Sequence, residues 1–144
     1  MTALREIERS HPAFTAMCAA LQAADLPTAD LLESGARYFA LGTYGYGGLV
    51  ELGNRALLRS MVVAKDHRGR GVGAAILNGL LAEARELGLE EVWLLTTTAD
   101  EFFSKRGFSR IPRGDAHAAI AGTAQFKQLC PGSAVLMRRS LLRE

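Results

Sequence analysis

A short segment rich in glycine and arginine is the part of this sequence best suited to bind a ligand. It runs from His67 to Ala74 and reads His-Arg-Gly-Arg-Gly-Val-Gly-Ala. Glycines at alternate positions remove side chains from the loop, so that consecutive backbone N–H groups can point at an anion. The helix that we expect to begin at Ala74 adds unpaired N–H groups and the positive end of its dipole. With Arg68 and Arg70 nearby, these groups predict a cradle for a pyrophosphate.

Other interpretations of this loop fit the sequence less well. A tight strand-to-helix turn that binds nothing needs fewer than three glycines and two arginines. A P-loop is excluded because its Gly-Lys-Ser/Thr end is missing. A dinucleotide-binding pattern is formally met by Gly69-x-Gly71-x-x-Ala74. However, the acids about twenty positions later, Glu90 and Glu91, open the next expected strand instead of closing it.

The elements that must position this loop predict one α/β domain over residues 1–144. The helix at 74–87 carries one apolar stripe, and the strand at 91–97 is apolar at nearly every position, as a strand covered on both faces should be. With the strand at 56–64 they form a βαβ unit, preceded by two helices and an antiparallel meander. Further strands are expected at 3–8, 37–42, 48–52, 108–111 and 134–140, and further helices from Ser10-His11-Pro12 and at 30–34, 99–106 and 116–129. We expect turns at 44–48 and 53–54, and helix caps at Ser10, Thr98 and Asp115.

Composition and charge exclude several classes of protein. The chain has 144 residues, 17 basic and 15 acidic, too little basic excess for a nucleic-acid surface. Cys18, Cys130 and three scattered histidines show neither disulfide nor metal-ligand spacing. No apolar run approaches the ~20 residues of a membrane span, and the first residues lack a signal-peptide core. We therefore expect a soluble cytoplasmic protein with no metal and no nucleic-acid or membrane partner.

Three motifs together resemble the GNAT superfamily of N-acetyltransferases. Arg68-x-x-Gly71-x-Gly73 has the spacing of that family's acetyl-CoA loop, and Met61-Val62-Val63 resembles its Leu-Ala-Val strand end. Residues 99–108 resemble its Ala-x-x-Phe-Tyr-x-x-x-Gly-Phe segment. The resemblance covers about residues 56–111. It implies a GNAT-like mixed sheet with a parallel βαβ unit and splayed central strands. The implied activity is transfer of an acetyl group from acetyl-CoA to the primary amine of a small molecule.

The resemblance also implies how acetyl-CoA is held. The pantetheine arm would pair with the backbone of residues 61–63, and an N–H near Val63 would stabilise the oxyanion. The residues expected to contact the cosubstrate are Met61, Val62, Val63, Arg68, Gly69, Arg70, Gly71, Val72, Gly73, Ala74 and Phe103.

Two positions depart from the family's pattern. Phe103 stands where a tyrosine usually protonates the departing thiolate, so the thiolate leaves unprotonated or takes its proton from Ser104 or from water. The glutamate often found on the fourth strand is missing, and Glu51 is the best candidate base, its alternative being a solvated edge carboxylate. These departures motivate a second hypothesis, a non-catalytic module that senses or binds acetyl-CoA.

The acceptor side is expected to include Arg37, Arg59, Thr96 and Thr97. Arg59 lies in an otherwise apolar strand, and its charge needs a substrate carboxylate or an internal acid. Several stretches resemble the arsenic-resistance N-acetyltransferase branch, among them 94–99, 111–113, 123–126 and 129–135. This implies a glutamate-like organoarsenical or a phosphinothricin-type amino acid as acceptor. Because dimers are common in the superfamily, a homodimer is expected.

Overall fold

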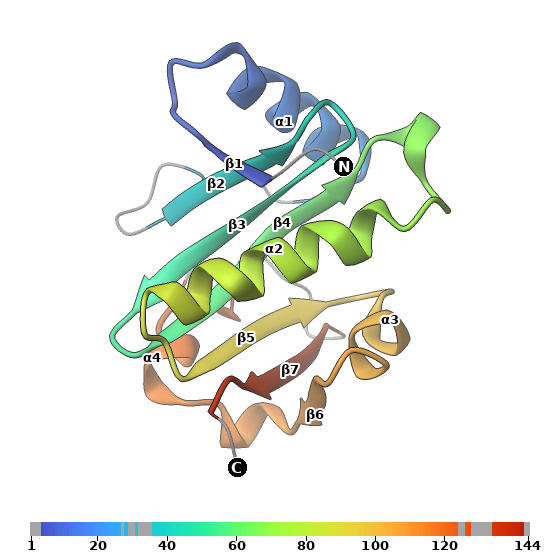
Figure 1. Ribbon diagram of the computed structural model, residues 1–144. Helices are drawn as coiled ribbons and strands as arrows, with labels where there is room; N and C mark the ends of the chain where they lie inside the picture. The colour runs from blue at the N-terminus through green and yellow to red at the C-terminus, as the bar shows by residue number, and fades with distance from the viewer. Residues whose placement is uncertain are drawn as a thin grey trace.

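One mixed sheet organises the chain (Figure 1). The computed structural model describes residues 4–26, 28, 31, 36–123, 126–127 and 134–142. Within these residues seven strands form a sheet in the order β1-β2-β3-β4-β5-β7-β6. Only β4 and β5 are parallel, and the other neighbours are antiparallel. The predicted mixed sheet with a parallel centre is confirmed, and a doubly wound nucleotide-binding sheet is excluded.

The strands follow the expected ranges closely. They are β1 (Leu4–Ile7), β2 (Ala36–Leu41), β3 (Gly45–Leu52), β4 (Arg55–Val63), β5 (Glu91–Thr96), β6 (Ser109–Ile111) and β7 (Val135–Ser140). The helices are α1 (Pro12–Ala23), α2 (Val72–Glu86), α3 (Asp100–Ser104) and α4 (Ala118–Ala121), with short 3-10 turns at Lys65–His67 and Arg113–Asp115. None of the helices in these ranges is long and apolar enough to cross a membrane.

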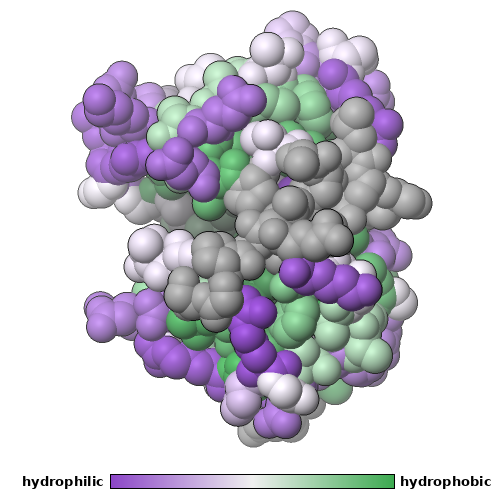
Figure 2. All heavy atoms as spheres, turned by 180° about the vertical axis from the view of Figure 1, so that it is seen from behind, coloured by the Kyte–Doolittle hydropathy of each residue, from purple (hydrophilic) through white to green (hydrophobic). Residues whose placement is uncertain are grey.

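Helices cover both faces of the sheet. The apolar stripe of α2, with Ile76, Leu77 and Leu80 all fully buried, packs on side chains of β2, β3, β4 and β5. The other face carries two smaller clusters, one under α1 and one that includes Ile120 of α4 and Trp93 of β5. Seen from this second side, Figure 2 shows hydrophobic residues in the upper and lower parts of the molecule, bordered by hydrophilic ones.

The expected turn at residues 44–48 is wrong, because β3 already begins at Gly45. A Cβ on Gly45 would lie 2.6 Å from a side-chain carbon of Ile76, and one on Gly47 would lie 2.8 Å from a carbon of Leu80. These glycines are needed because α2 packs directly on the strand. A glycine that makes room for a helix has the same sequence signature as a glycine that turns the chain.

The expected caps also need correction. His11, not Ser10, caps α1 through a bond from the Ala13 N–H, and His117, not Asp115, caps α4. Thr96 rather than Thr98 bonds the N–H of Ala99 at the start of α3.

The α-helical part of the predicted helix at 116–129 ends at Ala121, and Gly122 is its C-cap. Of the helix predicted at 30–34, only Leu31 is among the described residues, in a turn, and the position of Cys130 lies outside them.

Candidate functional site

A gap opens between β4 and β5 where their pairing stops. The parallel register joins Arg55–Leu57 to Glu91–Trp93, although β4 continues to Val63 and β5 to Thr96. Beyond Leu57 and Trp93 the two strands therefore diverge, as Figure 1 shows. Backbone N–H and C=O groups on the facing edges have no strand partner there and are available to a ligand.

A β-bulge in β4 lies beside this gap. Tyr46 pairs with Val62 and Gly48 with Arg59, so that Gly47 faces two residues of β4. The bulge includes Ser60, whose φ is +56°. The Ala64 N–H bonds the carbonyl of Tyr44, the residue just before β3. Because backbone groups alternate along a strand, the N–H and C=O of Val63 point the other way, into the gap.

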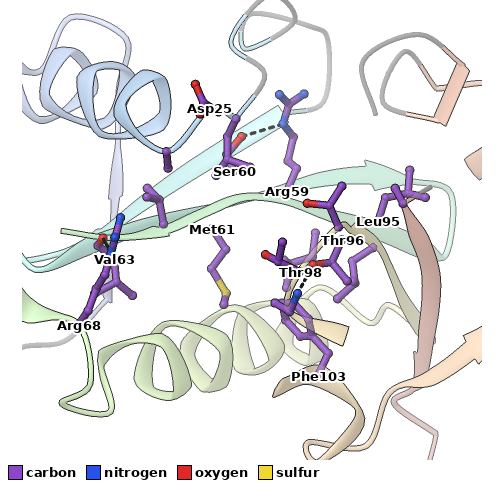
Figure 3. Close-up of a pocket in the computed structure, with 18 residues that line it drawn as sticks. Asp25, Arg59, Ser60, Met61, Val63, Arg68, Leu95, Thr96, Thr98 and Phe103 are labelled. Carbon is purple, nitrogen blue, oxygen red and sulfur yellow. Dashed lines mark hydrogen bonds between the residues drawn. The ribbon is translucent and has the colours of Figure 1, made fainter. Parts of the chain in front are cut away.

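A cavity of about 740 Å³ occupies the gap, and Figure 3 shows its lining. Five of the residues predicted to contact the cosubstrate line it: Met61, Val62, Val63, Arg68 and Phe103. Arg59, Thr96 and Thr97, expected on the acceptor side, line it too. In Figure 3, Arg59 and Ser60 lie on the side of β4 where α1 lies, whereas Met61 points to the side of α2. The cavity is thus lined by side chains from both faces of the sheet.

The glycine-rich loop stands at one end of the cavity and leads into α2. The helix begins at Val72, two residues earlier than expected, and Gly71 is its N-cap with φ +77° and no side-chain cap. The first N–H groups of α2, from Val72 to Ala74, therefore remain available to an anion. Arg68 donates from Nε to the Val63 carbonyl at 3.4 Å, and a Cβ at Gly73 would lie 3.7 Å from Val63 Cγ2. The loop thus directly adjoins the free end of β4.

Arg59 is a buried charge in the wall of the cavity. Its side chain is only 3% exposed, its Nε donates to Ser60 Oγ at 3.0 Å, and its guanidinium lies 6.0 Å from the ring centre of Tyr38. These and further contacts engage the arginine within the protein. With Arg68, it brings two basic side chains to the cavity wall, which suits a ligand that carries phosphate or carboxylate groups.

Phe103 closes the cavity from α3. It is 5% exposed and packs edge-on against Phe102 and Phe108, at ring-centre distances of 5.1 and 5.5 Å. Thr96 fixes the start of the same helix, since its Oγ1 accepts from the Ala99 N–H at 3.0 Å. The ring of Phe103 offers no proton to a bound molecule.

The structure places Glu51 and Ser104 outside the cavity. Glu51 is exposed and pairs with Ala56, at the end of the sheet where β4 and β5 are still joined. Ser104 follows Phe103 on α3 and is exposed. A side chain one residue from an inward-facing position points about 100° away on a helix, so Ser104 faces solvent.

Arg37 also lies away from the cavity. Its guanidinium donates to Glu6 Oε1 at 2.8 Å and to Glu83 Oε1 at 3.0 Å, and it lies over the ring of Phe39 on the α2 face. The hydrogen bond from Arg37 lowers the pKa of Glu6, and the same pair raises the pKa of Arg37. Arg37 therefore joins β1, β2 and α2 instead of reaching an acceptor.

Two polar residues of the cavity, Asp25 and Ser60, were not predicted from the sequence. Asp25 follows the end of α1, and Ser60 lies in the bulge of β4. Neither belongs to a motif, and a bulge leaves no periodic signal in the sequence. Among the described residues, no group of three or more His, Cys, Asp or Glu side chains is placed to hold a metal ion.

Comparison with known proteins adds an independent finding. The sequence model of the "Acetyltransferase (GNAT) domain" family matches residues 34–110, just over half of the chain. An amino-acid acetyltransferase of Mycobacterium tuberculosis is 34% identical over 73 residues, which are 51% of this chain and 38% of that protein. Across the curated relatives that it matches, the chain spans well under half of their length, down to 11% for an amino-acid acetyltransferase of Ralstonia nicotianae.

Solved structures show the same fold at low identity. N-acetylglutamate synthase from Neisseria gonorrhoeae, complexed with coenzyme A and N-acetyl-glutamate, superimposes with a TM-score of 0.77 at 18% identity over 99% of this chain and 36% of that one. Rv2747 from Mycobacterium tuberculosis, in complex with CoA and NLQ, gives a TM-score of 0.71 at 24% identity over 97% of this chain and 99% of that one.

Proposed function

Because this chain belongs to the GNAT family of acetyltransferases, we propose that it transfers an acetyl group from acetyl-CoA to the primary amine of a small amino acid. The observation that carries the proposal is the gap between β4 and β5, which directly adjoins the N-terminus of α2. A thioester can lie in that gap while its pyrophosphate binds the glycine-rich loop. The residues that would hold it there are Met61, Val62, Val63, Arg68, Gly69, Arg70, Gly71, Val72, Gly73, Ala74 and Phe103.

The chemistry proposed for this gap is direct transfer. The amine nitrogen attacks the thioester carbonyl carbon, a C–N bond forms, the C–S bond breaks, and the amine loses a proton to solvent. The Val63 N–H, which points into the gap, would donate to the carbonyl oxygen as its negative charge develops. The departing sulfur leaves as a thiolate, which a thiol pKa near ~8.5 makes tolerable without an acid. This path does not require a hydroxyl on Phe103, and solvent serves in place of Glu51 and Ser104.

The proposed acceptor is an amino acid with a second acidic group, a class that includes glutamate-like organoarsenicals and phosphinothricin. The basic side chain of Arg59 in the cavity wall supports an anionic acceptor, and Thr96 and Thr97 line the same cavity. The names of the amino-acid acetyltransferase relatives support an amino acid. The resemblance of residues 94–99 to the arsenic-resistance branch supports the narrower class. We also propose that the protein acts in the cytoplasm and that it forms a homodimer. Light scattering tests the homodimer.

The experiment has a binding arm and a turnover arm. Titration calorimetry with acetyl-CoA should give saturable binding, and Gly71→Glu should abolish it, because the new carboxylate enters the anion cradle. Release of free thiol should then be accelerated by L-glutamate or phosphinothricin over water alone. Absence of binding would overturn the whole proposal. Binding without turnover on any amine would instead support a non-catalytic acetyl-CoA-binding module.

A further inference from the structure

Asp25 occupies a left-handed backbone position, which glycine fills most often. Two non-glycine residues among those described have positive φ, Asp25 and Ser60, both at +56°, and both line the same cavity. The left-handed conformation is costly for a residue with a Cβ, and residues held in it cluster at functional sites. Of the two residues, Asp25 lies just after the end of α1.

The end of α1 is a Schellman motif with Asp25 at its left-handed position. Ala24 is the C-cap, the Asp25 N–H bonds the Gln22 carbonyl at 3.1 Å, and the Leu26 N–H bonds the Leu21 carbonyl at 2.9 Å. Glycine is the usual residue at this position, and asparagine the usual substitute. Aspartate also places a negative charge at the negative end of the helix dipole. For the stability of α1, aspartate is therefore a poor choice on two counts.

The cavity supplies a reason for the carboxylate. Asp25 is the one acidic residue among the described residues that line it, whereas Arg59 and Arg68 are both basic. In Figure 3 Asp25 lies at the end of α1, on the same side of β4 as Ser60 and Arg59 and opposite the sulfur of Met61. An acceptor that enters from the α1 side therefore meets one anionic group before it reaches the gap.

We propose that Asp25 binds the ammonium group of the acceptor, an inference that rests on the proposed function. An amine reaches the protein largely as its ammonium form, for which a carboxylate is the matching counter-ion. Side-chain carboxylates are weaker bases than α-amines by about four pK units, so Asp25 serves as the counter-ion and the proton leaves to solvent. With Arg59 near the acceptor's carboxylate, the cavity then recognises both ends of a zwitterion. The substrate class is thus an α-amino acid rather than a simple acid or a neutral amine.

The test compares Asp25→Asn with the wild type on two nucleophiles. Asparagine tolerates positive φ and keeps the shape of the side chain. With L-glutamate as acceptor, Asp25→Asn should raise KM at least tenfold and leave KM for acetyl-CoA within twofold. Hydroxylamine is uncharged at neutral pH and needs no anionic partner. With hydroxylamine as acceptor, kcat/KM of the variant should therefore stay within threefold of the wild-type value. Melting temperature should rise by about 1–4 °C, because asparagine suits the Schellman motif better.

Glu86→Gln is the matched control. Glu86 is an exposed acid in the last turn of α2 and does not line the cavity. Its replacement should leave the KM values for L-glutamate and acetyl-CoA unchanged. The role of Asp25 is overturned if Asp25→Asn acetylates L-glutamate as well as the wild type does. It is also overturned if the variant loses as much activity with hydroxylamine as with L-glutamate. If the wild-type protein uses hydroxylamine but not L-glutamate, the amino-acid class and the role of Asp25 both fail. If it uses neither, the proposed function fails.

Discussion

Leu57 of β4 and Trp93 of β5 form the last pair of residues that joins the two central strands. Both are buried, Leu57 at 1% and Trp93 at 3% exposure, in one cluster with Ile120 and Leu136. The cluster holds the strands together on one side of this pair, and the cavity begins on the other side. Packing around Leu57 and Trp93 therefore sets the point at which the binding gap opens.

Arg59→Met should separate recognition of an acceptor's carboxylate from general damage to the site. A charged hydrogen bond contributes about 1.5–3 kcal/mol, so kcat/KM for L-glutamate should fall by about tenfold or more. Propylamine, which has no carboxylate, should lose less than threefold, and steady-state thiol release measures both. Equal losses on the two amines would show that Arg59 only supports the fold.

Gly71 and Gly73 should respond in opposite ways to alanine. Gly71 has φ +77°, so Gly71→Ala should cost about 1–2 kcal/mol of stability and weaken acetyl-CoA binding by disturbing the loop. A Cβ at Gly73 would meet Phe102 at 3.5 Å, an ordinary contact, and Gly73→Ala should gain about 0.5–1 kcal/mol inside the helix. Urea unfolding measures both changes. If Gly71→Ala stabilised the protein, the cap of α2 would not require glycine at this positive φ.

Arg37→Met should leave catalysis unchanged. Arg37 is bound to Glu6 and Glu83 and lies outside the cavity, so KM for L-glutamate should stay within twofold of the wild-type value. Because these pairs are about one-third exposed, the loss of stability should be below ~1 kcal/mol. A large rise in the KM for L-glutamate would indicate that Arg37 contacts the acceptor.

The Glu6–Arg37 pair predicts a pH-dependent part of stability. The pKa of Glu6 is lowered in the folded state from its ordinary 4.5, chiefly by the hydrogen bond from Arg37. The stabilisation is therefore present above pH 4.5 and is lost as the pH falls through the lowered value. The free energies of unfolding of the wild type and Glu6→Gln, measured with urea, should differ by at most ~1 kcal/mol at pH 6. This difference should shrink towards pH 3. A difference that grows on acidification would contradict this sign.

Gly47→Ala should destabilise the protein more than an alanine at an open glycine. The new Cβ would lie 2.8 Å from Leu80 Cδ1 and 3.1 Å from Ile76 Cγ2, both in the fully buried core. Overpacking of this kind costs about 1–3 kcal/mol. Gly114→Ala, with nothing within 4 Å, is the control and should change stability by less than ~0.5 kcal/mol. Similar melting temperatures for the two variants would argue against close packing of α2 on β3.

Periodic patterns in the sequence were enough to predict the strands, α2 and the parallel pair, because hydrophobic spacing reports which face is buried. The glycine-rich loop was equally readable, since its residues are contiguous. Glu51, Ser104 and Arg37 lie outside the cavity, which the sequence did not predict because their positions depend on strand register and helix phase. Asp25 and Ser60 were missed because a bulge and a helix end bring them to the cavity, and neither feature is periodic.

The most direct test of the central claim follows an isotope-labelled acetyl group from acetyl-CoA to the amine of L-glutamate by mass spectrometry. We expect labelled N-acetyl-L-glutamate in amounts equal to the thiol released, and no labelled product from the Gly71→Glu protein. Thiol release without labelled amide, or equal product formation by Gly71→Glu, would contradict acetyl transfer from the gap between β4 and β5.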